Sequence, residues 1–166
     1  MKNPTALLRK QISYLMWFFM ISLALSGITA IPVRPGIQFL LDIVPSSWNE
    51  VYSFLLYIKQ ALFSSSEVLF YGYDWLAFAH IIIAILFYGV VRDPVRNIWV
   101  IEFGMIACVL VIPFALLMGY FRGIPLWWRF VDCSFGVFGI IPLWFAYRKT
   151  IDLVKIIEKE KLNTIF

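Results

Sequence analysis

Four long apolar segments, separated by shorter polar stretches, dominate the pattern of hydrophobic and polar positions along this chain. The first runs for 20 residues without a charged side chain, which is enough for a helix to cross about 30 Å of hydrocarbon. Three further apolar segments follow it. The pattern predicts an all-α integral membrane protein with four transmembrane helices in a compact bundle, at residues 14–33, 75–91, 99–121 and 131–147.

A cleaved signal peptide is the alternative for the first segment. Lys2, Arg9 and Lys10 precede the apolar run, and Ala24-Leu25-Ser26 resembles a cleavage site between small residues. The apolar run continues past this site to Val33, which favours an uncleaved span.

Residues 34–74 connect the first two predicted spans and are too few and too apolar for a domain with its own core. Ser47 and Glu50 have the spacing of a capping box. A stripe of apolar residues follows at helical spacing: Val51, Phe54, Leu55, Ile58 and Leu62. We expect an amphipathic helix over residues 47–63 that either lies in the outer interface of the membrane or covers the bundle as a lid.

The remaining connections carry helix-boundary signals. Asp93-Pro94 predicts a capped helix that starts at about Pro94, and Pro113 predicts a kink in the third span. Residues 122–125 predict a break before the fourth span. Residues 148–166 are expected to prolong the last helix as a cytoplasmic tail that is solvated at the lipid surface, and the alternative is that its apolar edge contacts a partner. Residues 1–166 are expected to form a single membrane domain.

Composition and charge support this topology. The chain is 62% hydrophobic and 14% charged, which excludes an ordinary soluble domain. Ten of its 14 lysines and arginines lie at the two termini or in residues 92–97, so the positive-inside rule predicts that both termini are cytoplasmic, in the cytoplasmic membrane. Because the basic residues flank apolar segments, the lipid bilayer is the expected partner and nucleic acid is not.

Two ionisable residues in the predicted spans are at similar depth below the outer surface. This similar depth permits His80 in the second span to pair with Asp132 in the fourth. Both lie on stripes of small residues, so we expect them to face protein. Arg122 and Arg129 lie near the same surface. These four residues form a hypothetical ligand-binding site, and the alternative is a buried interhelical hydrogen bond with two anchoring arginines.

Glu102 lies near the inner end of the third span, about 200° around the helix from the small residue Gly104. Its face is a hypothetical contact with another subunit, where Arg92, Arg96 or a cation of the partner would balance the carboxylate. The alternative is that Glu102 reaches the inner interface by itself.

Few residues are available for metal or covalent chemistry. One histidine and two cysteines cannot supply a bis-histidine haem or a four-ligand Cys/His zinc site within one chain. Cys108 and Cys133 are expected to be small packing residues. Nucleotide-binding, zinc-protease, serine-hydrolase and thioredoxin motifs are missing from the sequence, so we expect no catalytic residues and no metal site.

Two short segments resemble small membrane-bound b-type cytochromes: Leu25-Ser26-Gly27 in the first span and Trp75-Leu76-Ala77-Phe78-Ala79-His80 in the second. Those cytochromes carry a further histidine in the first span, where this chain has Tyr14. What the resemblance implies is therefore a haem held through His80 and shared between two protomers. Otherwise we expect no cofactor.

Two functional hypotheses follow. The first is a non-enzymatic membrane protein that acts by association, as an accessory or assembly subunit or as a homo-oligomer. The second is a protein that binds a lipid, a quinone or a haem, with redox or catalytic activity, through an outer-leaflet pocket that contains His80 and Asp132.

Overall fold

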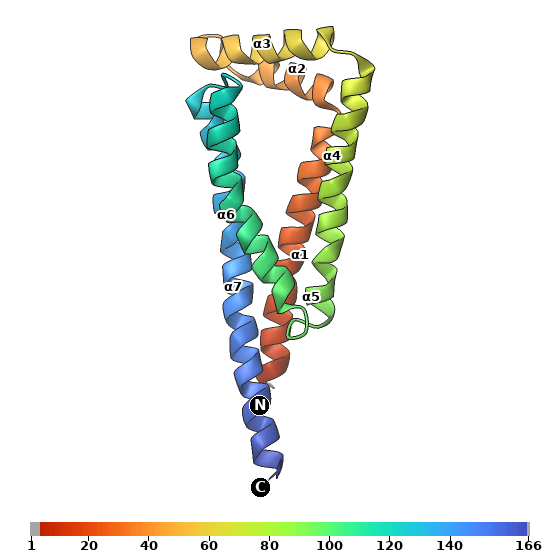
Figure 1. Ribbon diagram of the computed structural model, residues 1–166, viewed down its shortest axis with the longest axis vertical. Helices are drawn as coiled ribbons and strands as arrows, with labels where there is room; N and C mark the ends of the chain where they lie inside the picture. Colours follow the sequence, from red (N-terminus) through yellow and green to blue (C-terminus); the bar gives the residue numbers. More distant parts are fainter. Residues whose placement is uncertain (1–3, 166) are drawn as a thin grey trace. The chain divides into compact units, whose positions relative to one another are not determined.

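The computed structural model describes residues 4–165, and this part of the chain is helical without any strand. This part of the chain contains seven helices, which are labelled in Figure 1. Their bounds are α1 Pro4–Ala30, α2 Val33–Ile43, α3 Asn49–Ser64, α4 Glu67–Leu86, α5 Tyr88–Arg92, α6 Ile98–Phe121 and α7 Leu126–Ile165. Four helical stretches are long and apolar enough to cross a membrane: Pro4–Ala30, Glu67–Arg92, Ile98–Phe121 and Leu126–Asn163.

The chain divides into two compact units, which we describe separately. The first unit comprises Met1–Ile21 and Ala84–Phe166, and the second comprises Ser22–Ile83. The prediction that residues 1–166 form a single membrane domain stays a prediction.

The core of the first unit joins the beginning of α1 to α5, the beginning of α6 and the middle of α7. It is made of apolar side chains from all four helices: Ile12, Met16, Met20, Phe87, Val90, Val100, Ile101, Leu143, Ala146 and Leu153. The ring of Phe19 packs against this core, with its centre 4.7 Å from the centre of the Phe87 ring. This core draws together segments that are distant in the sequence.

Helices α6 and α7 pack along each other through small residues (Figure 1). A Cβ atom at Gly136 would collide with the carbonyl oxygen of Cys108, and one at Gly139 would lie 3.0 Å from the Cys108 sulfur. A Cβ atom at Gly104 would lie 3.0 Å from Leu143. Small residues therefore let α6 and α7 approach each other closely along this contact.

Helix α7 is continuous over 40 residues, about 60 Å, with Pro142 inside it. The predicted prolongation of the last helix is confirmed. Part of this prolongation packs rather than standing free: Leu153 is fully buried and Ile157 packs against the same core. The side chain of Lys149 also donates a hydrogen bond to the Gln11 side chain in α1, at 2.8 Å.

The predicted helix start at Pro94 is wrong, because a separate turn precedes α6. The Asp93 carboxylate accepts a hydrogen bond from the Arg96 amide at 3.2 Å. The Asn97 side chain donates to the carbonyls of Gly89 and Asp93, both at 2.9 Å. These bonds close the turn, and α6 begins only at Ile98.

In the second unit, the first helix ends earlier than predicted. The residue before a proline is disfavoured in the helical conformation, so α1 ends at Ala30, before Ile31 and Pro32. Helix α2 then begins at Val33 and was not predicted. Its proline at residue 35 lies in the first turn, where the missing N–H is tolerated.

Helices α2 and α3 lie against each other (Figure 1). Ile37 and Leu41 of α2 and Leu55 of α3 are buried, while Ser53 and Gln60 on the opposite face of α3 are exposed. A helix is thus present over most of the predicted range 47–63, and its interfacial position stays a prediction.

The predicted capping box is wrong. Helix α3 begins at Asn49, its N-cap residue is Trp48, and no side chain caps it. Ser47 therefore lies one residue too early to cap the helix, although the predicted spacing to Glu50 is present in the sequence.

The second apolar stretch also differs from its predicted bounds of 75–91. Helix α4 begins at Glu67, eight residues earlier, and ends at Leu86. The α-helical hydrogen-bond pattern is interrupted at Phe87, whose amide bonds to the Ala84 carbonyl three residues back at 3.2 Å, and the short helix α5 follows.

Candidate functional site

The four residues of the hypothetical ligand site are divided between the two units. His80 belongs to the second unit, on α4, while Arg122, Arg129 and Asp132 belong to the first. Their co-location therefore stays a prediction, and the surroundings of each residue are taken within its own unit.

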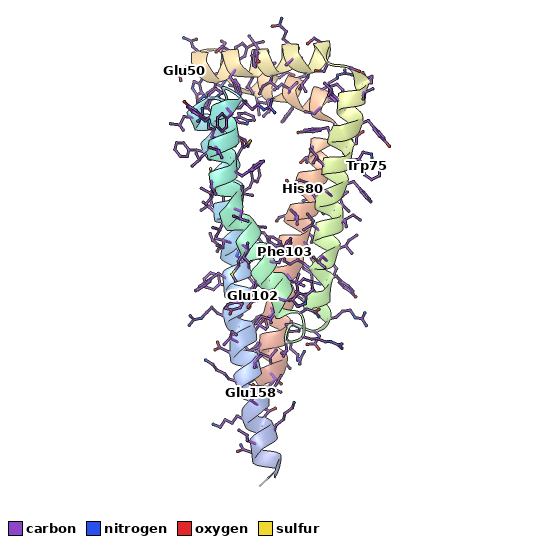
Figure 2. The ribbon with its side chains drawn as sticks, viewed as in Figure 1. Glu50, Trp75, His80, Glu102, Phe103 and Glu158 are labelled. Atoms are coloured by element: carbon purple, nitrogen blue, oxygen red, sulfur yellow. The ribbon has the colours of Figure 1, made fainter. Side chains whose placement is uncertain are left out.

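The His80 ring is held by its own helix. Its Nδ1 atom lies 2.8 Å from the Leu76 carbonyl oxygen, one turn earlier. Since a carbonyl oxygen only accepts hydrogen bonds, Nδ1 carries the proton in the neutral ring and Nε2 keeps its lone pair. The side chain is exposed (Figure 2). Nε2 is thus available as an acceptor or as a ligand atom.

A close helix crossing lies directly behind His80. A Cβ atom at Gly27 in α1 would lie 2.6 Å from the Ala77 carbonyl oxygen and 2.8 Å from the His80 Cβ atom. Ala77 is buried at this crossing. The glycine therefore lets the α1 backbone approach α4, which fixes the helix that carries the histidine.

The Arg129 side chain makes its contacts within the turn that joins α6 to α7. Its Nε atom donates to the Ile124 carbonyl oxygen at 2.7 Å, and its side chain crosses over Gly119 so closely that a Cβ atom there would lie 2.7 Å away. The guanidinium carbon lies 5.9 Å from the centre of the Tyr120 ring. Arg129 thus stabilises the turn.

The same turn ends α6 in a Schellman motif. The Ile124 amide bonds to the Gly119 carbonyl at 2.9 Å, and the Gly123 amide bonds to the Tyr120 carbonyl at 3.2 Å. Gly123 has a φ of 67°, the left-handed value that this motif needs. Among the described residues, neither Arg122, which is exposed, nor Asp132, which is half-buried, makes an ion pair.

Glu102 is half-buried on α6 (Figure 2). No ion pair or side-chain hydrogen bond joins it to Arg92, Arg96 or any other residue in the described part of the chain. On another face of α6, the space beside Gly104 is filled by Phe87 and Leu143. The Glu102 carboxylate therefore lies on a different face of α6 from Gly104, which packs against Phe87 and Leu143.

Sequence reasoning missed the role of Arg34, which joins three helices of the second unit. Its guanidinium donates to the Glu67 carboxylate of α4 at 2.8 Å and to the Leu62 carbonyl of α3 at 3.5 Å. It also lies 4.2 Å from the centre of the Phe70 ring. Glu67 is 33 residues away in the sequence, so no local signal predicts this contact.

The thiols and acidic groups do not gather into a metal site. Cys108 and Cys133 are free, and the Cys133 thiol lies 3.7 Å from the Ile112 carbonyl oxygen. Within residues 4–163, no three side chains of His, Cys, Asp or Glu come together as a metal-binding group.

Comparisons of this chain with protein-family models, with curated proteins and with solved structures give no match.

Proposed function

We propose that this chain is a multi-pass protein of the cytoplasmic membrane that acts by association, as an accessory or assembly subunit or as a homo-oligomer. The four apolar stretches span the bilayer and form a compact bundle. Their many exposed aromatic side chains support this proposal, since Phe18, Phe114 and Phe138 are each more than 60% exposed. Such side chains are suited to contact with lipid or with another membrane protein.

Both termini lie in the cytoplasm, and the pair formed by α2 and α3 lies in the outer interface. The support for this orientation is the excess of basic residues at the termini and in residues 92–97. The support for the interfacial position is the amphipathic pattern of α2 and α3, whose mutual contact is apolar while Gln38, Asp42 and Gln60 are exposed.

The observation that carries the association is the unpartnered carboxylate of Glu102. A carboxylate inside a membrane span is costly unless a cation or a donor balances it. Glu102 has none within the described chain, and it lies on α6 away from the face that Gly104 packs against Phe87 and Leu143. A second subunit that supplies a cation, such as an Arg92 or an Arg96 of another copy, satisfies this requirement.

Two differently tagged copies of the chain, co-expressed and purified in mild detergent, test this proposal. Glu102→Gln removes the charge and keeps the side-chain size, so we expect it to lower recovery of the second copy or of a partner protein at least fivefold. Glu158→Gln is the matched control, because Glu158 is an exposed acid in the last turns of α7. Equal recovery with both variants contradicts the role of Glu102.

The free Nε2 atom of His80 supports a second candidate function, the binding of a lipid, a quinone or a haem. Because Leu76 fixes the proton on Nδ1, Nε2 can accept a hydrogen bond from a quinol or coordinate a haem iron. Asp132, Arg122 and Arg129 would complete this site. His80→Ala is expected to abolish ligand retention without changing subunit recovery, whereas loss of subunit recovery alone argues against a ligand at His80.

A further inference from the structure

The same pair of residue types recurs in the first unit, near one end of α1, α5 and α6 and in the middle of α7. In each pair the cation lies three or four residues from the aromatic residue, on the side of the unit where α1 begins. The four pairs are Tyr14 with Lys10, Tyr88 with Arg92, Trp99 with Arg96, and Trp144 with Arg148. We call these eight residues the aromatic–cation band.

Contacts within the first unit place the four cations at a common level. Gln11, next to Lys10, bonds to Lys149, next to Arg148, at 2.8 Å. The rings of Trp17 and Tyr88 lie 6.1 Å apart, which aligns α1 with α5.

Gly104 packs against Leu143, which aligns α6 with α7. At 1.5 Å per residue, these contacts bring the four cations to within roughly two helical turns of one another along the helix axes.

The band is exposed and its charges are not used within the chain. The four aromatic side chains are between 46% and 64% exposed, and all four cations are exposed as well. Lys10 lies 5.7 Å from the Tyr14 ring centre, and Arg148 lies 6.0 Å from that of Trp144. Among the described residues, no carboxylate forms an ion pair with any of the four cations.

Two cations elsewhere in the chain behave differently. Arg34 pairs with Glu67, and the Nε atom of Arg129 donates to a backbone carbonyl. The four cations of the band therefore differ from Arg34 and Arg129, whose guanidinium groups are held by polar partners within the chain.

We propose that the aromatic–cation band binds the headgroups of anionic phospholipids in the cytoplasmic leaflet. This inference rests on the proposed membrane insertion and names the lipid class that surrounds the inner end of the helices. Tyr and Trp rings favour the headgroup region, and the long basic side chains one turn further out reach the phosphates. Each cation near an anionic surface raises affinity roughly fivefold.

Native mass spectrometry of the full chain, purified with an equimolar mixture of phosphatidylglycerol and phosphatidylcholine, tests the proposal. We expect the wild-type chain to retain the anionic lipid at least roughly tenfold more than the zwitterionic one. Lys10→Gln with Arg148→Gln is expected to lower this preference at least fivefold. Both residues lie outside the proposed Glu102 contact, so the two proposals are tested separately.

Two control variants sharpen the result. Lys159→Gln with Lys161→Gln removes the same charge from the last turns of α7, beyond the band, and is expected to leave the preference unchanged. Lys10→Arg with Arg148→Lys keeps the charge and is expected to keep the preference. An equal loss in the band and tail variants, or no loss in the band variant, overturns the proposal.

The remaining outcomes are also distinguishable. Extraction of the wild-type chain from membranes by alkaline carbonate contradicts membrane insertion, and the band proposal fails with it. An inserted chain without lipid preference contradicts the band alone. A co-purified acidic protein that is lost in the band variant, in place of the lipid, shows that the band has a protein partner and overturns the lipid assignment.

Discussion

Gly27 of α1 and His80 of α4 meet so closely that a Cβ atom at residue 27 would lie 2.8 Å from the Cβ atom of His80 and 2.6 Å from the Ala77 carbonyl oxygen. Backbone atoms cannot move aside as a flexible side chain can, so a side chain at residue 27 must push α1 and α4 apart. The crossing therefore depends on glycine.

Gly27→Ala is expected to destabilise the second unit by about 1–3 kcal/mol through overpacking, which lowers the melting temperature by roughly 3–10 °C. Gly72→Ala in α4 is the matched control, because no atom lies within 4 Å of a Cβ atom there. It is expected to be neutral or slightly stabilising. Thermal melting in detergent measures both, and equal shifts in the two variants contradict the close crossing.

The contacts of Arg34 predict that removing the Arg34 side chain costs more stability than neutralising its partner Glu67. The Glu67 carboxylate is 79% exposed, so the ion pair alone contributes little and Glu67→Gln is expected to cost less than about 1 kcal/mol. Arg34→Ala also removes the contact with Phe70 and the bond to Leu62, so we expect it to cost more. Arg34→Lys is expected not to restore the lost stability, because a lysine ammonium group lacks the planar guanidinium group that stacks on Phe70 and donates to two acceptors.

Hydrogen exchange of the α2 amides measures the Arg34 contacts. Faster exchange in Arg34→Ala than in Glu67→Gln is the expected order. The reverse order would mean that the ion pair, rather than the stacking on Phe70, holds α2 to its neighbours.

The turn between α6 and α7 requires a left-handed residue. Gly123→Ala keeps the Schellman hydrogen bonds only with a strained φ of 67°, so we expect a loss of about 1–2 kcal/mol. Gly36→Ala in α2 has open space around it and serves as the control. Thermal melting compares the two, and a neutral Gly123→Ala would show that this turn is not constrained as described.

Cysteine labelling tests the proposed orientation. Ser53→Cys on the exposed face of α3 is expected to react with an impermeant maleimide in intact cells. Glu158→Cys in the last turns of α7 is expected to react only after permeabilisation. The native thiols provide the background, since Cys133 is buried and Cys108 is half-buried. Reaction of Glu158→Cys in intact cells refutes a cytoplasmic C-terminus.

The sequence predicts the apolar helices well because their signal is long and local. Residues 49–64 form a helix where helical spacing of apolar residues predicts one over 47–63. The exact ends of the helices are harder to predict from the sequence. The start of α6 at Ile98 depends on side-chain bonds from Asp93 and Asn97, which a Pro94 start signal does not reveal.

Helix α2 escapes prediction for a different reason. Pro35 and Gly36 near its start do not favour a helix by themselves, and the burial of Ile37 and Leu41 beside α3 and the contacts of Arg34 with Leu62 and Glu67 come from residues outside α2. Prediction of the candidate site is limited in the same way, because it also depends on contacts that the local sequence does not reveal. The sequence identifies His80, but its tautomer depends on a 2.8 Å contact with Leu76, and the role of Arg34 depends on a residue from another helix.

Native mass spectrometry of the tagged chain in mild detergent tests the central claim, that this protein acts by association, most directly. The account predicts a discrete oligomer or a complex with another membrane protein, which Glu102→Gln weakens and His80→Ala leaves intact. A monomer that carries a haem, a quinone or a lipid mass, lost in His80→Ala, would contradict the claim and make ligand binding the function.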